Sequence, residues 1–171
     1  MELRKFIATT IKEYLNENVE YKHYVVFHSS NEYFNKFDLS KITNMGGDLY
    51  GYGFYFTNNI TYSKQFGKYT YKCEITLSKP LDLTIKSTKE TLLNLIKIID
   101  IPKDELHSLI SLINNNSFTT AFRYIRKYIS FEELSNIFDG VIGYADADGG
   151  GKEYVVYNPN NIKILSIEVL S

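Results

Sequence analysis

Three residues of the chain stand where a folded domain could present chemical groups to a substrate. His28 directly follows the apolar run 24–27, and Tyr55 lies in an aromatic strand introduced by a Gly-Tyr-Gly sequence. Glu153 begins an apolar strand that comes after three glycines. A carboxylate at a strand end beside a flexible loop is where enzymes often place a catalytic group. Each residue alone also fits an ordinary surface or core position, so the three gain meaning only together.

Other signatures of catalytic or metal sites are incomplete. Gly51 and Gly53 are not followed by the third glycine and the helix that a dinucleotide-binding fingerprint requires. The loop that begins at Asp146 has Tyr157 at its twelfth position, where a calcium loop requires glutamate. The three histidines show no ligand spacing, and the single cysteine, Cys73, excludes a cysteine-rich zinc site. We therefore predict no metal site.

The strands that would hold these residues are short and rich in aromatic side chains. Apolar and polar residues alternate from Tyr69 to Leu77, which predicts a strand with one buried face. On this pattern Cys73 points inward and is not a nucleophile. Further strands are expected at 24–27, 54–57, 141–142, 153–157 and 162–170, and Pro80 is expected to end the pairing of its strand. A short helix is predicted from Asn58 to Phe66, after a mostly irregular segment from 31 to 52.

The middle of the chain has helical periodicity. Apolar residues recur at helical spacing between positions 87 and 138, and two sequences fit capping boxes, at Ser87–Glu90 and Ser130–Glu133. Residues 1–18 predict a further amphipathic helix, which would pack on the domain or bind a partner. The order of strands, helical block and strands predicts one α+β domain over residues 1–171, with 87–138 as a helical insertion.

Composition excludes several classes of protein. The 19 basic and 20 acidic residues give a formal net charge of −1, which argues against a basic face for duplex DNA. The 44% hydrophobic content argues against disorder. The sequence shows no signal peptide and no apolar stretch of about 20 residues, so we expect a cytoplasmic protein that does not enter a membrane. The 15 tyrosines give only weak support to an RNA-binding role. Aromatic residues that stack on RNA bases normally accompany a basic groove.

Three segments, VFHSS at 26–30, GYGFYFT at 51–57 and KEYVVY at 152–157, carry a resemblance to a known family. In this order and with these separations they resemble the His-Tyr-Glu class of ADP-ribosyltransferases, which contains diphtheria toxin and the poly-ADP-ribose polymerases. The sequence is most similar to small ADP-ribosyltransferase domains of phages and mobile elements. The resemblance covers residues 24–83 and 139–169, and it implies the split β-sandwich of that family with the helical block inserted.

The resemblance also implies a role for each matching residue toward NAD. His28 would hold a ribose hydroxyl of the adenosine half, and Tyr55 would stack on the nicotinamide ring. Glu153 would be the catalytic glutamate. The remaining residues of the cofactor-binding set would be those that clamp or flank the nicotinamide: Ser29 through its backbone, Ser30, Gly53, Ser63 through a hydrogen bond to the carboxamide, and Phe66 as a second stacking ring.

Two departures from the family pattern bear on these roles. Ser29 stands where the family has glycine directly after the histidine, so a side chain occupies space that is normally open. Gly151 lies two residues before Glu153, where relatives that modify arginine carry glutamate or glutamine, which argues against arginine as the acceptor.

The function implied is transfer of ADP-ribose from NAD to a macromolecular acceptor, more mono- than poly-ADP-ribosylation, with release of nicotinamide. Breaking the bond between nicotinamide and ribose creates an oxocarbenium-like sugar, so one carboxylate suffices without metal or nucleophile. A protein acceptor is favoured over nucleic acid by the near-neutral charge. Two alternatives stay open: an NAD glycohydrolase, and a non-enzymatic NAD-binding or virion interaction module. For a phage-encoded protein, the expected location is the host cytoplasm.

Overall fold

The computed structural model describes residues 20–42, 49–145, 149 and 151–170. It combines one seven-stranded sheet with a group of helices, so the predicted α+β class is confirmed. The amphipathic helix expected at 1–18 lies outside the described residues. The strands are β1 (Lys22–Ser30), β2 (Phe54–Thr57), β3 (Tyr69–Leu77), β4 (Pro80–Asp82), β5 (Gly140–Tyr144), β6 (Lys152–Val156) and β7 (Ile162–Val169). The helices are α2 (Ile60–Ser63), α3 (Thr88–Ile98), α4 (Lys103–Asn114), α5 (Phe118–Ile125) and α6 (Phe131–Ile137), with short 3-10 turns η1 (Leu39–Lys41), η2 (Lys64–Phe66) and η3 (Pro159–Asn161).

The sheet has the order β4-β5-β6-β2-β1-β3-β7 and divides into two halves. Between β2 and β1 the register contains a single pair, Phe27 with Thr57, whereas β1 pairs with β3 along its whole length from Lys22 to Ser30. The two halves, β4-β5-β6-β2 and β1-β3-β7, are therefore joined at a narrow junction. All neighbouring strands are antiparallel except β4 and β5.

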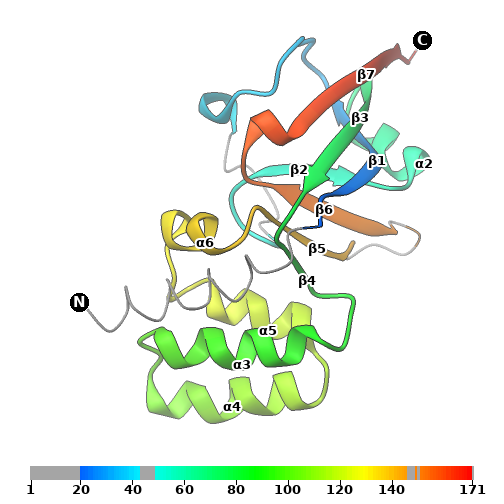
Figure 1. Cartoon of the computed structure of the whole chain (residues 1–171). Helices are drawn as coiled ribbons and strands as arrows, with labels where there is room; N and C mark the ends of the chain where they lie inside the picture. The colour runs from blue at the N-terminus through cyan, green and yellow to red at the C-terminus, as the bar shows by residue number, and fades with distance from the viewer. Residues whose placement is uncertain (1–19, 43–48, 146–148, 150, 171) are drawn as a thin grey trace.

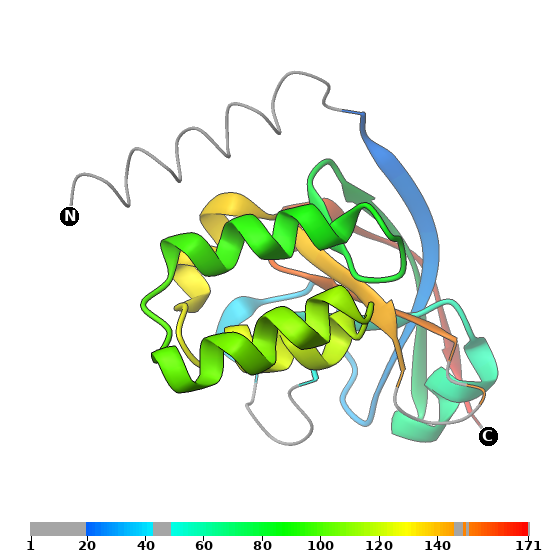
Figure 2. The same cartoon turned by 90° about the horizontal axis from the view of Figure 1, so that it is seen from below.

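Two hydrophobic cores follow from this division. The first fills the space between the β4-β5-β6-β2 half and helices α3 to α6, which lie together on one side of the strands (Figure 1). Figure 2 shows these helices on one side of β5 and β6, with β1, β3 and β7 on the other. The second core unites inward-facing residues of both halves of the sheet: Val26, Phe54, Phe56, Tyr71, Cys73, Ile75, Leu77, Ile142, Tyr154 and Val156. Cys73 is completely buried there, in agreement with the alternation that predicted it.

Several strand boundaries shift from the prediction by one or more residues, and two of the differences bear on the site and on the sheet edge. β1 extends to Ser30, so His28 lies inside the strand and does not follow it. Pro80 begins β4 instead of ending the pairing, because this edge strand pairs in parallel with β5. An edge strand tolerates proline at its first residue, since the missing N–H faces no partner strand.

The helical block forms where it was predicted, and one of its two capping boxes is present. Ser130 accepts a hydrogen bond from the Glu133 amide, and the Glu133 carboxylate accepts one from the Ser130 amide in return. Ser87 does not cap α3, because its backbone is already helical and its side chain makes no capping bond. Within the described part of the chain, no helix is both long and apolar enough to cross a bilayer.

Candidate active site

Sheet order brings three distant segments of the chain together. β6, β2 and β1 are consecutive in the sheet, and they carry Glu153, Tyr55 and His28. Glu153 is paired with Thr57 on one side and with Gly143 on the other, so its position along the sheet is fixed by two neighbouring strands. Tyr55 is paired with Val155, two residues after Glu153, and side chains two apart on a strand share one face. Glu153 and Tyr55 therefore lie on the same face of the sheet.

Asn58 anchors the chain immediately before Glu153. The Asn58 side-chain oxygen accepts a hydrogen bond from the Lys152 amide at 2.9 Å, and the Asn58 amide donates to the Lys152 carbonyl at 3.2 Å. Next to it, the Asn59 side chain caps α2 by accepting from the Tyr62 amide and donates to the Gly149 carbonyl. The two asparagines thus tie the glycine-rich loop to the end of β2. The sequence placed Asn58 only at the start of the predicted short helix, and it did not single out Asn59.

A tyrosine that the sequence did not single out covers the strand beside Glu153. The Tyr50 ring is completely buried over Gly143, and any side chain added at Gly143 would collide with the Tyr50 hydroxyl. That hydroxyl donates a 2.6 Å hydrogen bond to the Tyr144 carbonyl. Because Gly143 is paired with Glu153, the Tyr50 ring forms a wall next to the carboxylate on the β5 side.

The Tyr55 hydroxyl holds the turn that leads into its own strand. It donates a 2.6 Å hydrogen bond to the Gly51 carbonyl and accepts one of 3.2 Å from the Tyr50 amide. The ring is half-buried against the core under the helices. Gly53 has φ of +152° and lies against Val155, so only glycine fits between these strands. Gly53 therefore has a structural reason to be present, besides its predicted place beside NAD.

His28 links the two halves of the sheet at their junction. Its Nδ1 lies 2.8 Å from the Tyr55 carbonyl, and since a carbonyl only accepts, Nδ1 carries the proton. In the neutral ring, Nε2 then remains an acceptor for a hydroxyl donor. The ring is surrounded by the aromatic side chains of Phe34, Phe37, Phe56 and Tyr71. Burial lowers the pKa of His28 below its ordinary value, against a smaller opposite effect of the bond to Tyr55.

The Ser29 side chain points into the interior of the protein. Its hydroxyl lies 2.9 Å from the hydroxyl of Ser63 and 2.9 Å from that of Thr70, and all three residues are buried. The side chain is therefore accommodated inside the protein by two hydrogen bonds. Thr70 was expected on the polar face of β3, but it is buried, and its hydroxyl is satisfied by the hydrogen bond to Ser29.

The remaining predicted residues are more exposed. The Ser30 hydroxyl accepts a hydrogen bond from the Glu32 amide at the end of β1. Phe66 is 57% exposed at the end of η2, and its ring meets that of Tyr62 edge-on at 5.1 Å. Both lie near the end of β1, because Gly67 packs directly on the Ser30 backbone.

The helical block contributes one residue to the edge of this region. Arg126, at the end of α5, lies against Gly51, where an added β-carbon would be 3.0 Å from its Nη1 atom. Burial raises the pKa of Tyr157, and the Arg126 charge acts against this effect. Through Arg126 the helical block therefore packs against the turn held by Tyr55, which is a structural role. No spacing signal in the sequence connects these positions.

Comparison with known proteins now adds to the geometry. A family model described as "ADP-Ribosyltransferase in polyvalent proteins" matches residues 21–169. The chain belongs to this family. A comparison with curated proteins finds no match. Among solved structures, one described as an anti-CRISPR protein is similar at 13% identity and a TM-score of 0.40, covering 85% of this chain and 94% of the other.

This match confirms that the chain is a member of an ADP-ribosyltransferase family, as the three segments indicated. It covers the helical block as well, which the resemblance left unexplained. The assignment to the His-Tyr-Glu class, the relation to phage proteins and the role of each site residue stay predictions. Among the residues described, no group of three or more metal-binding side chains occurs.

Proposed function

We propose that this chain is an NAD-dependent ADP-ribosyltransferase that transfers ADP-ribose to a macromolecular acceptor. One observation carries the proposal beyond family membership: β1, β2 and β6 are consecutive in the sheet and carry His28, Tyr55 and Glu153. These residues are separated by 27 and 98 positions in the sequence, so only the fold places the strands that carry them side by side. Catalysis requires such positioning of separate groups around one substrate.

The residues present fit NAD as the donor substrate. His28 offers Nε2 as an acceptor for a ribose hydroxyl, because its Nδ1 proton is held by the Tyr55 carbonyl. The Ser29 side chain is turned inward to Ser63 and Thr70, so its backbone is free of steric hindrance from its own side chain. Tyr55 presents a half-buried ring for stacking on the nicotinamide. A serine at position 29 is therefore compatible with the backbone clamp that the resemblance implies.

The chemical step is the cleavage of the bond between the nicotinamide nitrogen and the ribose carbon C1′. The bonding electrons leave with the nicotinamide, which becomes neutral, and positive charge develops on the ribose ring. Glu153 stabilises this charge from its fixed place between Thr57 and Gly143. The acceptor then forms its bond to C1′ and gives up a proton. No nucleophile of the protein takes part.

The test compares Glu153→Gln with Glu168→Gln, the same change on the exposed face of β7. Gln keeps the size of the side chain and removes its charge. We expect Glu153→Gln to lower nicotinamide release from labelled NAD by about 10²–10³-fold, the usual effect of losing one electrostatic stabiliser. NAD affinity, measured by calorimetry, should stay within about tenfold of wild type. The control Glu168→Gln should retain full activity.

Wild-type turnover by Glu153→Gln at saturating NAD would refute the assignment of this carboxylate. If wild-type protein releases nicotinamide but leaves all labelled ADP-ribose free in a host lysate, water is the acceptor and the chain is an NAD glycohydrolase. If no nicotinamide is released while NAD binds, the binding-module alternative is correct.

A further inference from the structure

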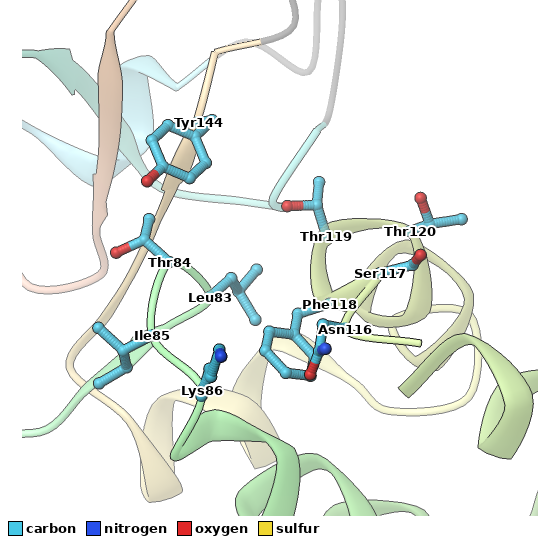
Figure 3. A pocket seen from close by; sticks show the side chains of 10 residues that line it. All are labelled: Leu83, Thr84, Ile85, Lys86, Asn116, Ser117, Phe118, Thr119, Thr120 and Tyr144. Atoms are coloured by element: carbon cyan, nitrogen blue, oxygen red, sulfur yellow. The ribbon is translucent and has the colours of Figure 1, made fainter. Parts of the chain in front are cut away.

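A cavity of about 320 Å³ opens at the ends of β4 and β5, and β5 is the neighbour of β6, the strand that carries Glu153. None of the predicted NAD-binding residues lines it. In Figure 3, Tyr144, Thr84 and Ile85 lie along one wall, with Ser117, Thr119 and Thr120 opposite. The cavity is lined by Leu83, Thr84, Ile85, Lys86, Asn116, Ser117, Phe118, Thr119, Thr120 and Tyr144. Its volume lies at the lower end of the range of ligand sites, about 300–1,000 Å³.

The order of strands places this cavity on the far side of Glu153 from the expected adenosine end of NAD. Across the sheet, His28 is on β1, Tyr55 on β2 and Glu153 on β6, and the cavity is at the ends of β5 and β4. Tyr144 is the partner of Lys152, the residue before Glu153. If NAD extends from Glu153 toward His28, the space toward β5 and β4 remains open to the second substrate.

The distance suits a segment of the acceptor. Neighbouring strands lie about 4.8 Å apart, so β5 and β4 are roughly 5–10 Å from β6. An extended peptide covers about 3.3–3.6 Å per residue. Two or three residues of an acceptor would therefore connect the cavity with the reacting carbon next to Glu153.

The lining is rich in hydrogen-bond donors and has a cation. None of the ten lining residues is acidic, and Lys86 adds a positive charge. In the described part of the chain, no side chain pairs with the Lys86 ammonium group. At the rim, the Lys152 ammonium group donates to the Thr84 hydroxyl at 3.1 Å, and this hydroxyl in turn donates to Asp82. The Asp82 charge is thus engaged outside the cavity, which leaves Lys86 to attract an anion.

We propose that this cavity binds an acidic segment of the protein acceptor, with a carboxylate side chain next to Lys86. The proposal rests on the proposed transferase function. Leu83 and Phe118 provide an apolar floor for the aliphatic part of such a side chain. The Tyr144 hydroxyl on one wall and the hydroxyls of the opposite wall can donate to the carboxylate. A nucleic acid fits less well, because its phosphates require a series of cations, whereas the lining contains a single lysine.

The first experiment measures binding of a fluorescein-labelled hexaglutamate peptide to the full chain by fluorescence polarisation. We expect Lys86→Glu to weaken binding at least tenfold, because repulsion replaces attraction. Thr119→Glu, on the opposite wall, should cause a similar loss. The control is Lys72→Glu, an exposed site on β3 that does not line the cavity and should bind the peptide as wild type does. Circular dichroism and a thermal melt check that each variant is folded.

The outcomes separate this proposal from the proposed function. Glu153→Gln should lose NAD cleavage but keep peptide affinity, since Glu153 does not line the cavity. If wild type cleaves NAD while hexaglutamate affinity is equal in Lys86→Glu and Lys72→Glu, the cavity proposal is wrong and the transferase assignment stands. A labelled single-stranded oligonucleotide that binds more tightly than the peptide, and whose affinity depends on Lys86, would overturn the choice of a protein acceptor.

Discussion

The three buried hydroxyls of Ser29, Ser63 and Thr70 offer the sharpest test of how the protein tolerates serine where the resemblance led us to expect glycine. Ser29 is the middle member, and its hydroxyl lies 2.9 Å from each of the others. One O–H group can donate only once, so Ser29 must accept at least one of its two hydrogen bonds from a neighbouring hydroxyl. Ser29→Ala therefore removes two buried hydrogen bonds at the same time.

The expected cost follows from this geometry. A net contribution of about 0.5–1.5 kcal/mol per hydrogen bond gives a loss of roughly 1–3 kcal/mol for Ser29→Ala. Thr70→Val keeps the shape of its side chain and removes one of the two bonds, so its cost should be about half as large. The double variant Ser29→Ala with Thr70→Val should cost less than the sum, because both changes delete the same bond.

Urea unfolding followed by circular dichroism measures these losses. Ser135→Ala is the control, because this exposed serine makes one local bond to the Glu132 carbonyl and should change stability by no more than about 0.5 kcal/mol. If Ser29→Ala is as stable as Ser135→Ala, or if the two buried changes add fully, the three hydroxyls do not act as a connected chain.

On the proposed function, Ser29→Ala should also raise the KM for NAD about tenfold with little effect on kcat, since Ser63 loses the hydrogen bond with Ser29.

Two further predictions concern titratable groups. The lowered pKa of His28 means that the unfolded chain takes up a proton before the folded protein does, so stability should fall as the pH drops from about 7.5 through about 6.5 toward the folded pKa. His28→Gln should flatten this dependence in urea unfolding, and an unchanged slope would show that other groups cause it. Burial raises the pKa of Cys73 to about 12, so the thiol should resist iodoacetamide in the folded protein and react once urea unfolds it. Rapid alkylation without unfolding would contradict its place in the core.

The sequence predicts those parts of the fold that depend on local patterns. The alternation from Tyr69 to Leu77 gives the bounds of β3 correctly, because one buried face imposes a period of two. The capping box at Ser130 forms because its four residues contain both partners. The similar sequence at Ser87 fails because a turn that begins earlier has already made its backbone helical. The four residues of the motif carry no information about the turn that precedes them.

Features that depend on contacts between segments far apart in the sequence cannot be predicted from local sequence patterns. Pro80 is a sound signal for a strand end, yet the parallel neighbour β5, about sixty residues later, makes it a strand beginning. Thr70 alternates as a polar surface residue, but Ser29 of β1, which is itself bonded to Ser63 of α2, forms a hydrogen bond with it. For the same reason Tyr50 and Asn58 were missed, since their partners Tyr144 and Lys152 are more than ninety residues away.

His28 lies at the junction between the two halves of the sheet, where it has a structural role besides its proposed contact with NAD. β1 and β2 share a single paired position, Phe27 with Thr57, so backbone pairing alone holds the halves weakly together. The hydrogen bond from His28 to the Tyr55 carbonyl crosses this junction and fixes Tyr55 relative to β1. The Nδ1 atom of His28 is thus structural, while Nε2 is the atom expected to meet NAD. Loss of NAD binding in His28→Ala would therefore combine a displaced Tyr55 with a missing contact. His28→Asn, whose amide can still donate to the Tyr55 carbonyl, separates the two effects.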